Sequence, residues 1–343
     1  IISKFLSTFS KEFKMAKGKM NVYGAGGTGI NVARHIANRS QEFNSEAFAD
    51  REIFFLDTSA SNLGGLNSKD PNVYIYEDAD GAGKNRRHVA NIIMENVNPV
   101  LLKFKPAEIN IVIASNSGGS GSVIAPSLIS ELLSRGENVI FFGVNSYEDR
   151  KALENVIASM KTYESISKLR EKPVVACLFE NTPEMSENAV NKRISDNVIM
   201  LSALFSRNNE GLDTQDLRNW LNYDKVTGFN PSFSQLVIQV GEVNKSPEHH
   251  LIASAVLSPS RDNHKPYGFM VDYQTVGYFD QKKTNDQLNN EPVNYLIYDG
   301  TIEAMFKKQQ KMLHDMDEEA QARTKKRSIL SSSDKAESNG LMF

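Results

Sequence analysis

Three glycine-rich segments of this sequence have the composition of loops that hold phosphate groups. They read GAGGTG at 24–29, DGAGKNR at 80–86 and SGGSGS at 117–122. Glycines let the backbone approach phosphate oxygens, and a helix that follows adds N–H donors and the positive end of its dipole. None of the three matches GxxxxGK[ST], so the sequence excludes a P-loop NTPase. We expect these loops to hold the phosphate chain of a nucleotide together.

Taken alone, the first segment is also typical of two different structures. It contains GxGxxG, and Asp57 ends the next apolar run, so a Rossmann-type oxidoreductase could bind NAD through Gly24, Gly26, Gly29 and Asp57. A single glycine loop could also be a tight turn that requires positive φ. A dinucleotide site needs one pyrophosphate turn, whereas two glycine loops at the ends of parallel strands suit a longer phosphate chain. The spacing therefore favours a nucleoside triphosphate, with NAD as the alternative.

The segments that position these loops alternate between strands and helices. Short apolar runs predict strands from Met20 and at 52–57, 73–76, 109–115, 138–144 and 173–179. Helical spacing follows most of these runs, and a long helix carries an apolar stripe of Val190, Ile194, Val198, Leu201 and Phe205. Continuous apolar strands separated by helices are typical of a parallel sheet that helices cover on both faces. The fold class is therefore α/β.

The length of 343 residues favours two domains. We expect a nucleotide-binding domain at 20–185, a central helix at 186–206, and a smaller α/β domain at 207–300. Strand candidates in the smaller domain lie at 233–241, 250–258, 269–279 and 294–300. A C-terminal helix and a mobile tail follow at 301–343, and the helix is expected to bury Ile302, Met305, Phe306, Met312, Leu313 and Met316 on one side.

Residues 1–14 form an amphipathic pattern, with apolar side chains at helical spacing at Ile2, Phe5, Leu6, Phe9 and Phe13. A membrane-surface or targeting helix would have this pattern. We instead treat 1–19 as an N-terminal extension outside the fold, because Met15 and Met20 directly precede the first strand.

Composition excludes several classes of partner. With 39 Lys and Arg against 42 Asp and Glu, the net charge of −3 gives no overall cationic field for nucleic acid or anionic lipid. The single cysteine, Cys177, cannot form an intrachain disulfide or a zinc cluster, and the histidines show no metal-ligand spacing. No apolar run reaches 18 residues. We therefore expect a soluble protein in a reducing compartment, without direct nucleic-acid or membrane binding.

The loop motifs resemble those of the tubulin and FtsZ superfamily. The third loop, followed by Ala125-Pro126, is similar to that family's GGGTGTG with AP after it, although Ser117 and Val123 replace glycines. The first loop, through Asn31, is similar to the family's first nucleotide loop, and GAG at 81–83 with Asn85 to its third. The order and spacing of these motifs hold over about residues 20–300. The phrases NTPE, EGLDTQDLR and LNYDKVT look closest to the PhuZ subfamily of tubulins from large nucleus-forming bacteriophages.

This resemblance implies a site for GTP or GDP, with Mg²⁺ held mainly through phosphates and water. Asn181 and Asn191 match the amides that contact guanine, and Glu148 matches an acid that contacts the ribose. The full expected set is Gly24, Ala25, Gly26, Gly27, Thr28, Asn31, Asp57, Gly81, Ala82, Gly83, Asn85, Ser117, Gly118, Gly119, Ser120, Gly121, Ser122, Glu148, Asn181 and Asn191. For Glu148 and Asp57, a solvated charge and a strand-end turn respectively are the simpler alternatives.

Two further acids match the family's synergy loop, NxDFADV, which follows the central helix. Asp213 and Asp216 stand at these positions in GLDTQDLR. In the family such acids come from the next subunit and align the water that attacks the γ-phosphate, so hydrolysis requires a polymer. The structural alternative is helix capping, because Asp213 precedes a helical segment and Asp216 falls in its first turn. The two roles are compatible.

The resemblance also implies a cellular role. A protein of this type would be a GTPase that polymerises head to tail into dynamic filaments in the host bacterial cytoplasm. For the phage subfamily, the filaments would form a spindle-like array that positions replicating phage DNA at midcell and transports capsids. Its partners would be other copies of itself, with the phage nucleus shell or capsids as cargo. The mixed acidic and basic C-terminus departs from the acidic tail of phage relatives.

Overall fold

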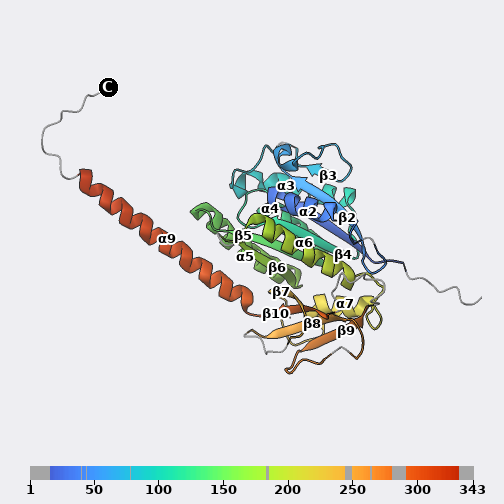
Figure 1. The fold of residues 1–343 in the computed structure, drawn as a ribbon. Helices are drawn as coiled ribbons and strands as arrows, with labels where there is room; N and C mark the ends of the chain where they lie inside the picture. Colours follow the sequence, from blue (N-terminus) through green and yellow to red (C-terminus); the bar gives the residue numbers. More distant parts are fainter. Residues whose placement is uncertain are drawn as a thin grey trace, which may run out of the picture.

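One ten-stranded sheet runs through the computed structural model, which describes residues 16–39, 41–43, 45–77, 79–182, 185–243, 249–262, 265–279 and 291–331 (Figure 1). The N-terminal segment 1–14 and the end of the C-terminal tail lie outside the described residues. The strand order is β3-β2-β1-β4-β5-β6-β7-β10-β8-β9. The first seven strands in this order pair in parallel, β10 is antiparallel to both β7 and β8, and β9 is parallel to β8.

The strands have the bounds β1 (Lys19–Ala25), β2 (Asp50–Asp57), β3 (Val73–Ile75), β4 (Ile109–Ser115), β5 (Val139–Ser146), β6 (Val174–Asn181), β7 (Phe233–Val240), β8 (Leu251–Ser258), β9 (Tyr273–Tyr278) and β10 (Val293–Tyr298). Nearly every side chain of β1, β4 and β5 is buried, as expected for strands covered on both faces. The predicted α/β fold with a parallel sheet is therefore confirmed.

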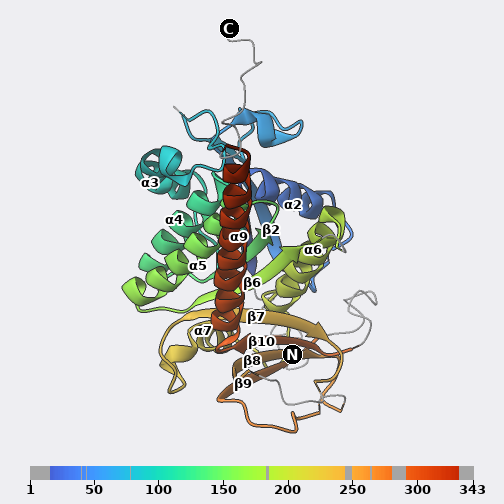
Figure 2. The ribbon, with the colours of Figure 1, turned by 90° about the vertical axis from the view of Figure 1, so that its left-hand side faces the viewer.

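The helices form a layer on each face of the sheet. They are α2 (Gly26–Asn38), α3 (Arg86–Lys103), α4 (Gly121–Ser134), α5 (Arg150–Arg170), α6 (Glu187–Leu204), α7 (Thr214–Leu221) and α9 (Thr301–Ser331), with short 3₁₀ turns η1 (Ala60–Leu63) and η2 (Tyr223–Lys225). Side chains of α2, α6 and α7 join one hydrophobic core, and those of α3, α4 and α5 join the other. Figure 2 shows α3, α4 and α5 on one side of the parallel strands and α2 and α6 on the other.

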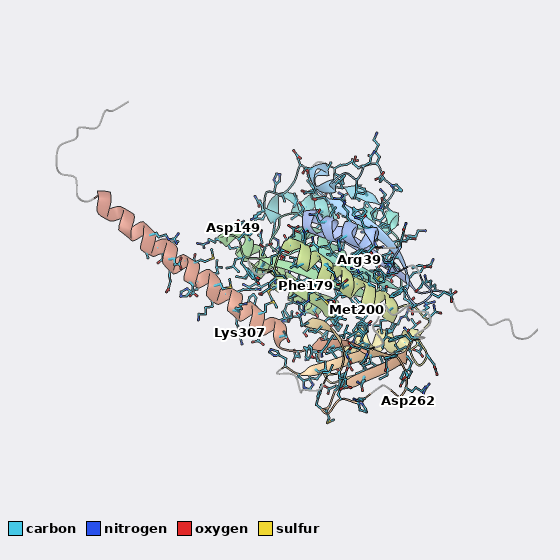
Figure 3. The ribbon with its side chains drawn as sticks, viewed as in Figure 1. Arg39, Asp149, Phe179, Met200, Asp262 and Lys307 are labelled. Carbon is cyan, nitrogen blue, oxygen red and sulfur yellow. The ribbon has the colours of Figure 1, made fainter. Side chains whose placement is uncertain are left out.

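Helix α6 is the long helix predicted at 186–206, and it runs back along the sheet from the end of β6. Its eighteen residues span about 27 Å at 1.5 Å per residue. At its far end the N–H groups of Gly18 and Ala49, next to the starts of β1 and β2, donate to the carbonyls of Ser206 (3.1 Å) and Ser202 (2.7 Å). Arg39, which directly follows α2 and is labelled in Figure 3, forms an ion pair with Asp196 in the middle of α6 (2.5 Å). The helix therefore runs from the carboxyl ends of the parallel strands to their amino ends.

The pairing of β6 with β7 joins the two regions that the sequence separated. Val174, Val175 and Ala176 pair with Phe233, Ser234 and Gln235, so the sheet continues across the expected boundary. The proposed division at 186–206 stays a prediction.

Helix α9 packs against α5 and β7, and its distal part extends past the rest of the molecule (Figure 1). Ile302 and Gln309 are buried, but Met316 is 36% exposed. The predicted burial is therefore wrong for Met316, which lies on an exposed side of α9 although its neighbour Asp317 still pairs with Arg150 of α5. Met305, Phe306, Met312 and Leu313 are only partly buried. The helix also continues through the charged segments at 315–319 and 323–327. Within the described residues, no helix has the length and apolar character to cross a membrane.

Candidate phosphate-binding site

A pocket of about 340 Å³ lies at the carboxyl ends of β1 and β4. All three glycine-rich segments contribute to it, although residues 30–116 separate the first from the third in the chain. Its lining consists of Ala25, Gly26, Gly27, Thr28, Ser59, Ser61, Asn62, Asp80, Gly81, Ala82, Gly83, Ser115, Gly118, Gly119, Ser120 and Gly121. The structure thus brings together the loops that the sequence predicted to hold one phosphate chain.

Two helices begin at this pocket without a side-chain cap. Ala25 and Ser120 are the N-cap residues of α2 and α4, and neither side chain bonds to its helix. The first N–H groups of a helix have no partner within the helix, and they carry the positive end of its dipole. Two uncapped helix starts in one pocket therefore form a site suited to a polyanion.

Close backbone contact explains why glycine is required where the loops meet. A Cβ on Gly26, whose φ is +71°, would lie 2.7 Å from the Gly121 nitrogen. A Cβ on Gly119 would lie 2.4 Å from the Ala82 Cβ. These two glycines therefore let the first and second loops pack directly against the third. Gly24 does not line the pocket, because it packs against Gly29 and Ala33 where α2 crosses β1.

Asp57 supports the pocket from beneath. Its carboxylate is fully buried and accepts hydrogen bonds from the Asn62 side chain (2.7 Å) and the Thr58 N–H (2.6 Å). Burial raises the pKa of Asp57, and the hydrogen bonds from Asn62 and Thr58 oppose that increase. The Thr58 hydroxyl in turn lies 2.6 Å from that of Ser120. Asp57 is not a lining residue, so it acts on the pocket through Asn62 and, by way of Thr58, through Ser120.

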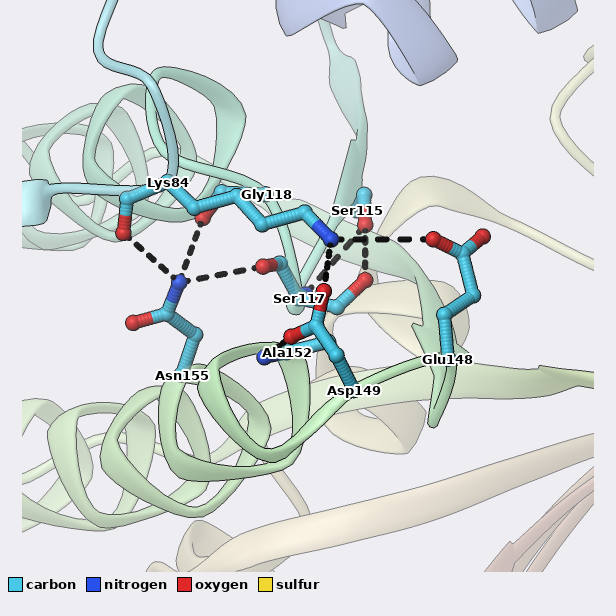
Figure 4. Close-up of polar contacts among 8 residues, drawn as sticks. All are labelled: Lys84, Ser115, Ser117, Gly118, Glu148, Asp149, Ala152 and Asn155. Atoms are coloured by element: carbon cyan, nitrogen blue, oxygen red, sulfur yellow. Dashed lines mark hydrogen bonds and ion pairs between the residues drawn. The ribbon is translucent and has the colours of Figure 1, made fainter. Parts of the chain in front are cut away.

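The cations of the second loop point away from the pocket. Lys84 Nζ pairs with Asp149 (2.7 Å) and Glu148 (3.6 Å), as Figure 4 shows. The hydrogen bond between Lys84 and Asp149 raises the pKa of Lys84 and lowers that of Asp149. The Arg86 guanidinium donates to the Ser122 carbonyl (3.1 Å). The lining within the described residues therefore contains no Lys or Arg, and its positive potential comes from backbone N–H groups.

Several expected contact residues lie outside this pocket. Ser117 and Ser122 shape the third loop, since their hydroxyls bond to the Ser115 hydroxyl (2.8 Å) and the Gly118 carbonyl (2.6 Å). Asn31 is exposed on α2, Asn85 precedes α3, and Glu148 pairs with Lys84.

Asn181 and Asn191 lie near the end of β6 and the start of α6, where the sequence predicted the guanine contacts. Asn191 is buried, and Asn181 Oδ1 is buried without a hydrogen bond to any described residue. An unpartnered buried acceptor is costly, so it suits a position that a ligand donor satisfies.

The sequence interpretation missed four lining residues: Ser59, Ser61, Asn62 and Ser115. Asp80 also lines the pocket, and it belongs to the second predicted loop, although it was not among the expected contacts. Ser59, Ser61 and Asn62 follow β2, which pairs in parallel with β1. Because the carboxyl ends of neighbouring parallel strands meet at one edge, the polar segment SASN after Asp57 could have been assigned to the site.

Asp213 and Asp216 cap helix α7. Asp213 Oδ1 accepts from the N–H groups of Gln215 (2.7 Å) and Asp216 (2.9 Å), and Asp216 Oδ2 accepts from the Asp213 N–H (3.0 Å). The capping alternative is therefore present in the structure. The second oxygen of each carboxylate has no hydrogen bond to a described residue, so each acid retains an acceptor.

The two acids lie toward the amino ends of the parallel strands, whereas the pocket lies at their carboxyl ends. The acids follow α6 in the chain, and the last turn of α6 bonds beside the starts of β1 and β2. Helix α7, which the acids cap, packs on β8 and β9. The helix alone spans about 27 Å, which no side chain can bridge. Within one molecule the acids therefore cannot reach a ligand in the pocket.

No group of three or more His, Cys, Asp or Glu side chains is arranged to hold a metal ion in the described part of the chain.

Comparison with known proteins identifies the family. No protein-family model matches the chain. A phage tubulin-like protein of Pseudomonas phage PhiPA3 is 32% identical over 251 residues, which cover 72% of this chain and 76% of that protein. The phage tubulin-like protein of Pseudomonas phage phiKZ is 28% identical and covers 96% of this chain and 99% of its own. A solved protofilament of TubZ from bacteriophage PhiKZ has a TM-score of 0.79 at 28% identity, over 94% of this chain and 99% of that one. The chain belongs to the phage tubulin-like proteins.

Proposed function

We propose that this chain is a GTPase that binds GTP in the glycine-lined pocket and polymerises head to tail into filaments. The observation that carries the proposal is the pocket itself, where two uncapped helix starts and three glycine loops converge. Membership of the phage tubulin-like proteins favours a nucleoside triphosphate over the NAD alternative.

The residues present fit a guanine nucleotide. N–H groups of the first and third loops would bind the phosphate oxygens. Asn181 Oδ1 would accept a hydrogen bond from the donor edge of guanine, and the buried Asn191 lies near the start of α6. The positive charge that the lining lacks would come from Mg²⁺ on the phosphates, with Asp80 as the lining carboxylate able to contact it.

The split between pocket and acids supports hydrolysis between subunits. If the face at the amino ends of one molecule's parallel strands stacks on the face at the carboxyl ends of the next molecule's strands, Asp213 and Asp216 approach the neighbour's pocket. Their unused oxygens would then orient a water molecule for in-line attack on the γ-phosphate. A contact between two different faces of the molecule can repeat from one subunit to the next without closing into a ring, and it therefore generates a filament. A relative of similar fold has been solved as a protofilament.

The cellular role follows from the family resemblance. We propose that the filaments form in the host bacterial cytoplasm as a spindle-like array. This array would position replicating phage DNA at midcell and carry capsids to it, without direct contact to nucleic acid.

Light scattering and phosphate release would test the enzymatic proposal with GTP, GDP and NAD in parallel. We expect scattering above a threshold protein concentration with GTP and Mg²⁺ only, followed by phosphate release that rises with the amount of polymer. Phosphate release that is proportional to protein concentration below that threshold would contradict a shared site. Absence of both signals with GTP would refute the proposal.

A further inference from the structure

The third glycine loop is held from behind by one buried amide of α5. Asn155 is 3% exposed, and its Nδ2 donates to the carbonyls of Ser117 (3.0 Å) and Lys84 (3.1 Å), with Gly118 at 3.4 Å (Figure 4). All its partners on this side are acceptors. The position therefore requires a donor, which an amide supplies and a carboxylate does not.

Ser159 extends the same contact by one turn of α5. It is fully buried, and its hydroxyl donates to the Asn116 carbonyl (3.1 Å). Residues four apart lie on one face of a helix, so Asn155 and Ser159 contact three successive carbonyls, those of residues 116, 117 and 118.

The direction of these carbonyls fixes the direction of the N–H groups. In a planar trans peptide the C=O and the N–H point in opposite directions. When the carbonyls of Ser117 and Gly118 turn toward α5, the N–H groups of Gly118 and Gly119 turn away from it. Both glycines line the pocket. The N–H of Ser117 follows the same rule, because it donates to the Ser115 hydroxyl, which also lines the pocket.

Asn155 also fixes the second loop against the third. Its partner Lys84 has a φ of +59°, in the left-handed region that non-glycine residues rarely occupy. Lys84 Nζ is held by Asp149, whose other oxygen caps α5 through the Ala152 N–H (2.7 Å). Side chain and backbone of Lys84 are thus both tied to the first two turns of α5.

We propose that Asn155 is a positioning residue for nucleotide binding, with Ser159 in a secondary role. It aims the N–H groups of Gly118 and Gly119 at the phosphates and holds the second loop closed on the third. This inference rests on the proposed nucleotide site, and it assigns to α5 the pre-organisation of that site. Asn155 does not line the pocket, so its effect on binding would pass through the two loops that it holds.

Asn155→Asp in the full chain tests the proposal, because it keeps the shape and replaces the donor with a carboxylate facing carbonyl oxygens. We expect the affinity for GTPγS, measured below the assembly threshold, to fall about tenfold or more. Binding of guanosine, followed by ligand-observed NMR, should stay within about twofold, since guanosine has no phosphates. Ser159→Ala should weaken GTPγS binding by about threefold, and it serves if the first variant does not fold.

Ser165→Ala is the matched control, because this exposed serine of α5 bonds, among the described residues, only to the Lys161 carbonyl of its own helix. It should bind both ligands as wild type does. Equal losses for GTPγS and guanosine would show a general folding effect and overturn the inference. So would unchanged GTPγS affinity in both Asn155→Asp and Ser159→Ala. If wild type itself binds no GTPγS, the proposed nucleotide site fails first.

Discussion

The side chain of Gln309, in the C-terminal helix, donates a hydrogen bond of 3.0 Å to the hydroxyl of Tyr147, which follows β5. Gln309 is fully buried, and Tyr147 donates in turn to Glu180 at the end of β6 (2.9 Å). Burial, and then the charge of Glu180, raise the pKa of Tyr147, so its hydroxyl remains a donor. Helix α9 is therefore anchored to the strand ends beside the expected ribose and guanine contacts.

We expect Gln309→Ala to lower the free energy of unfolding by about 1–3 kcal/mol, because it removes a buried donor and leaves the Tyr147 hydroxyl one partner short. Urea unfolding without nucleotide measures this. Gln310→Ala, on the exposed side of the same turn, is the control and should change stability by less than about 0.5 kcal/mol. Equal effects of the two variants would show that the anchor contributes nothing.

Gly119→Ala should damage the pocket through crowding. The added methyl would lie 2.4 Å from the Ala82 Cβ and 3.1 Å from the Lys84 nitrogen, so the second loop must move away. Overpacking of this kind costs about 1–3 kcal/mol, which corresponds to a loss of about five- to 150-fold in GTPγS affinity if the strain appears on binding. Fluorescence titration with a GTP analogue measures the change.

Gly228→Ala is the control for that variant. Its Cβ would meet no atom within 4 Å, and its φ does not lie in the left-handed range. We expect unchanged nucleotide affinity and, if anything, a small gain in stability of about 0.4–1 kcal/mol from reduced freedom of the unfolded chain. Wild-type affinity in Gly119→Ala would mean that the second loop does not close on the third.

Local sequence patterns were sufficient to predict those elements whose structure depends mainly on their own residues. The run 109–115 was predicted with the bounds that β4 has, because an apolar run there ends at a polar, glycine-rich loop. The glycine loops were equally visible, since their composition indicates both the tight backbone and the donors. The fold class and the three-loop pocket follow from such local signals.

Long-range partners were not predictable in this way. Lys84 pairs with Asp149, 65 residues later, and that choice depends on how α5 packs beside the second loop. A lysine in a glycine loop looks like a phosphate ligand until its neighbour is known. The continuity of the sheet from β6 to β7 has no local signature either, because only three residue pairs make it.

The buried carboxyl of Asp57 should give the protein a recognisable pH dependence. Its pKa is raised in the folded state, so the folded protein binds this proton more tightly than the unfolded chain does. The stabilising contribution is complete below the ordinary carboxyl value of about 4, and it is lost as pH rises through the folded pKa. The advantage of wild type over Asp57→Asn should therefore shrink as the pH rises from about 4 toward 7.

Urea unfolding of wild type and Asp57→Asn at several pH values measures the difference in their free energies of unfolding. The other titratable groups are the same in both proteins, so their contributions cancel in this difference. A stability difference that grows with pH would mean that the hydrogen bonds from Asn62 and Thr58 outweigh burial. In that case Asp57 would hold the charge that Asn62 needs for its orientation.

The last prediction separates capping from catalysis at Asp213 and Asp216. Asparagine caps a helix about as well as aspartate, so Asp213→Asn and Asp216→Asn keep the hydrogen bonds at the start of α7 while removing a negative charge. If the acids serve a neighbour's pocket, each variant should assemble with GTP but release phosphate on the order of a hundredfold more slowly. Gln215→Ala, at an exposed position between them, should release phosphate at the wild-type rate. Because the caps survive, slow release cannot be attributed to a melted helix. Wild-type release by both asparagine variants would leave Asp213 and Asp216 as caps alone, and the shared site would then need another source for its water-orienting group.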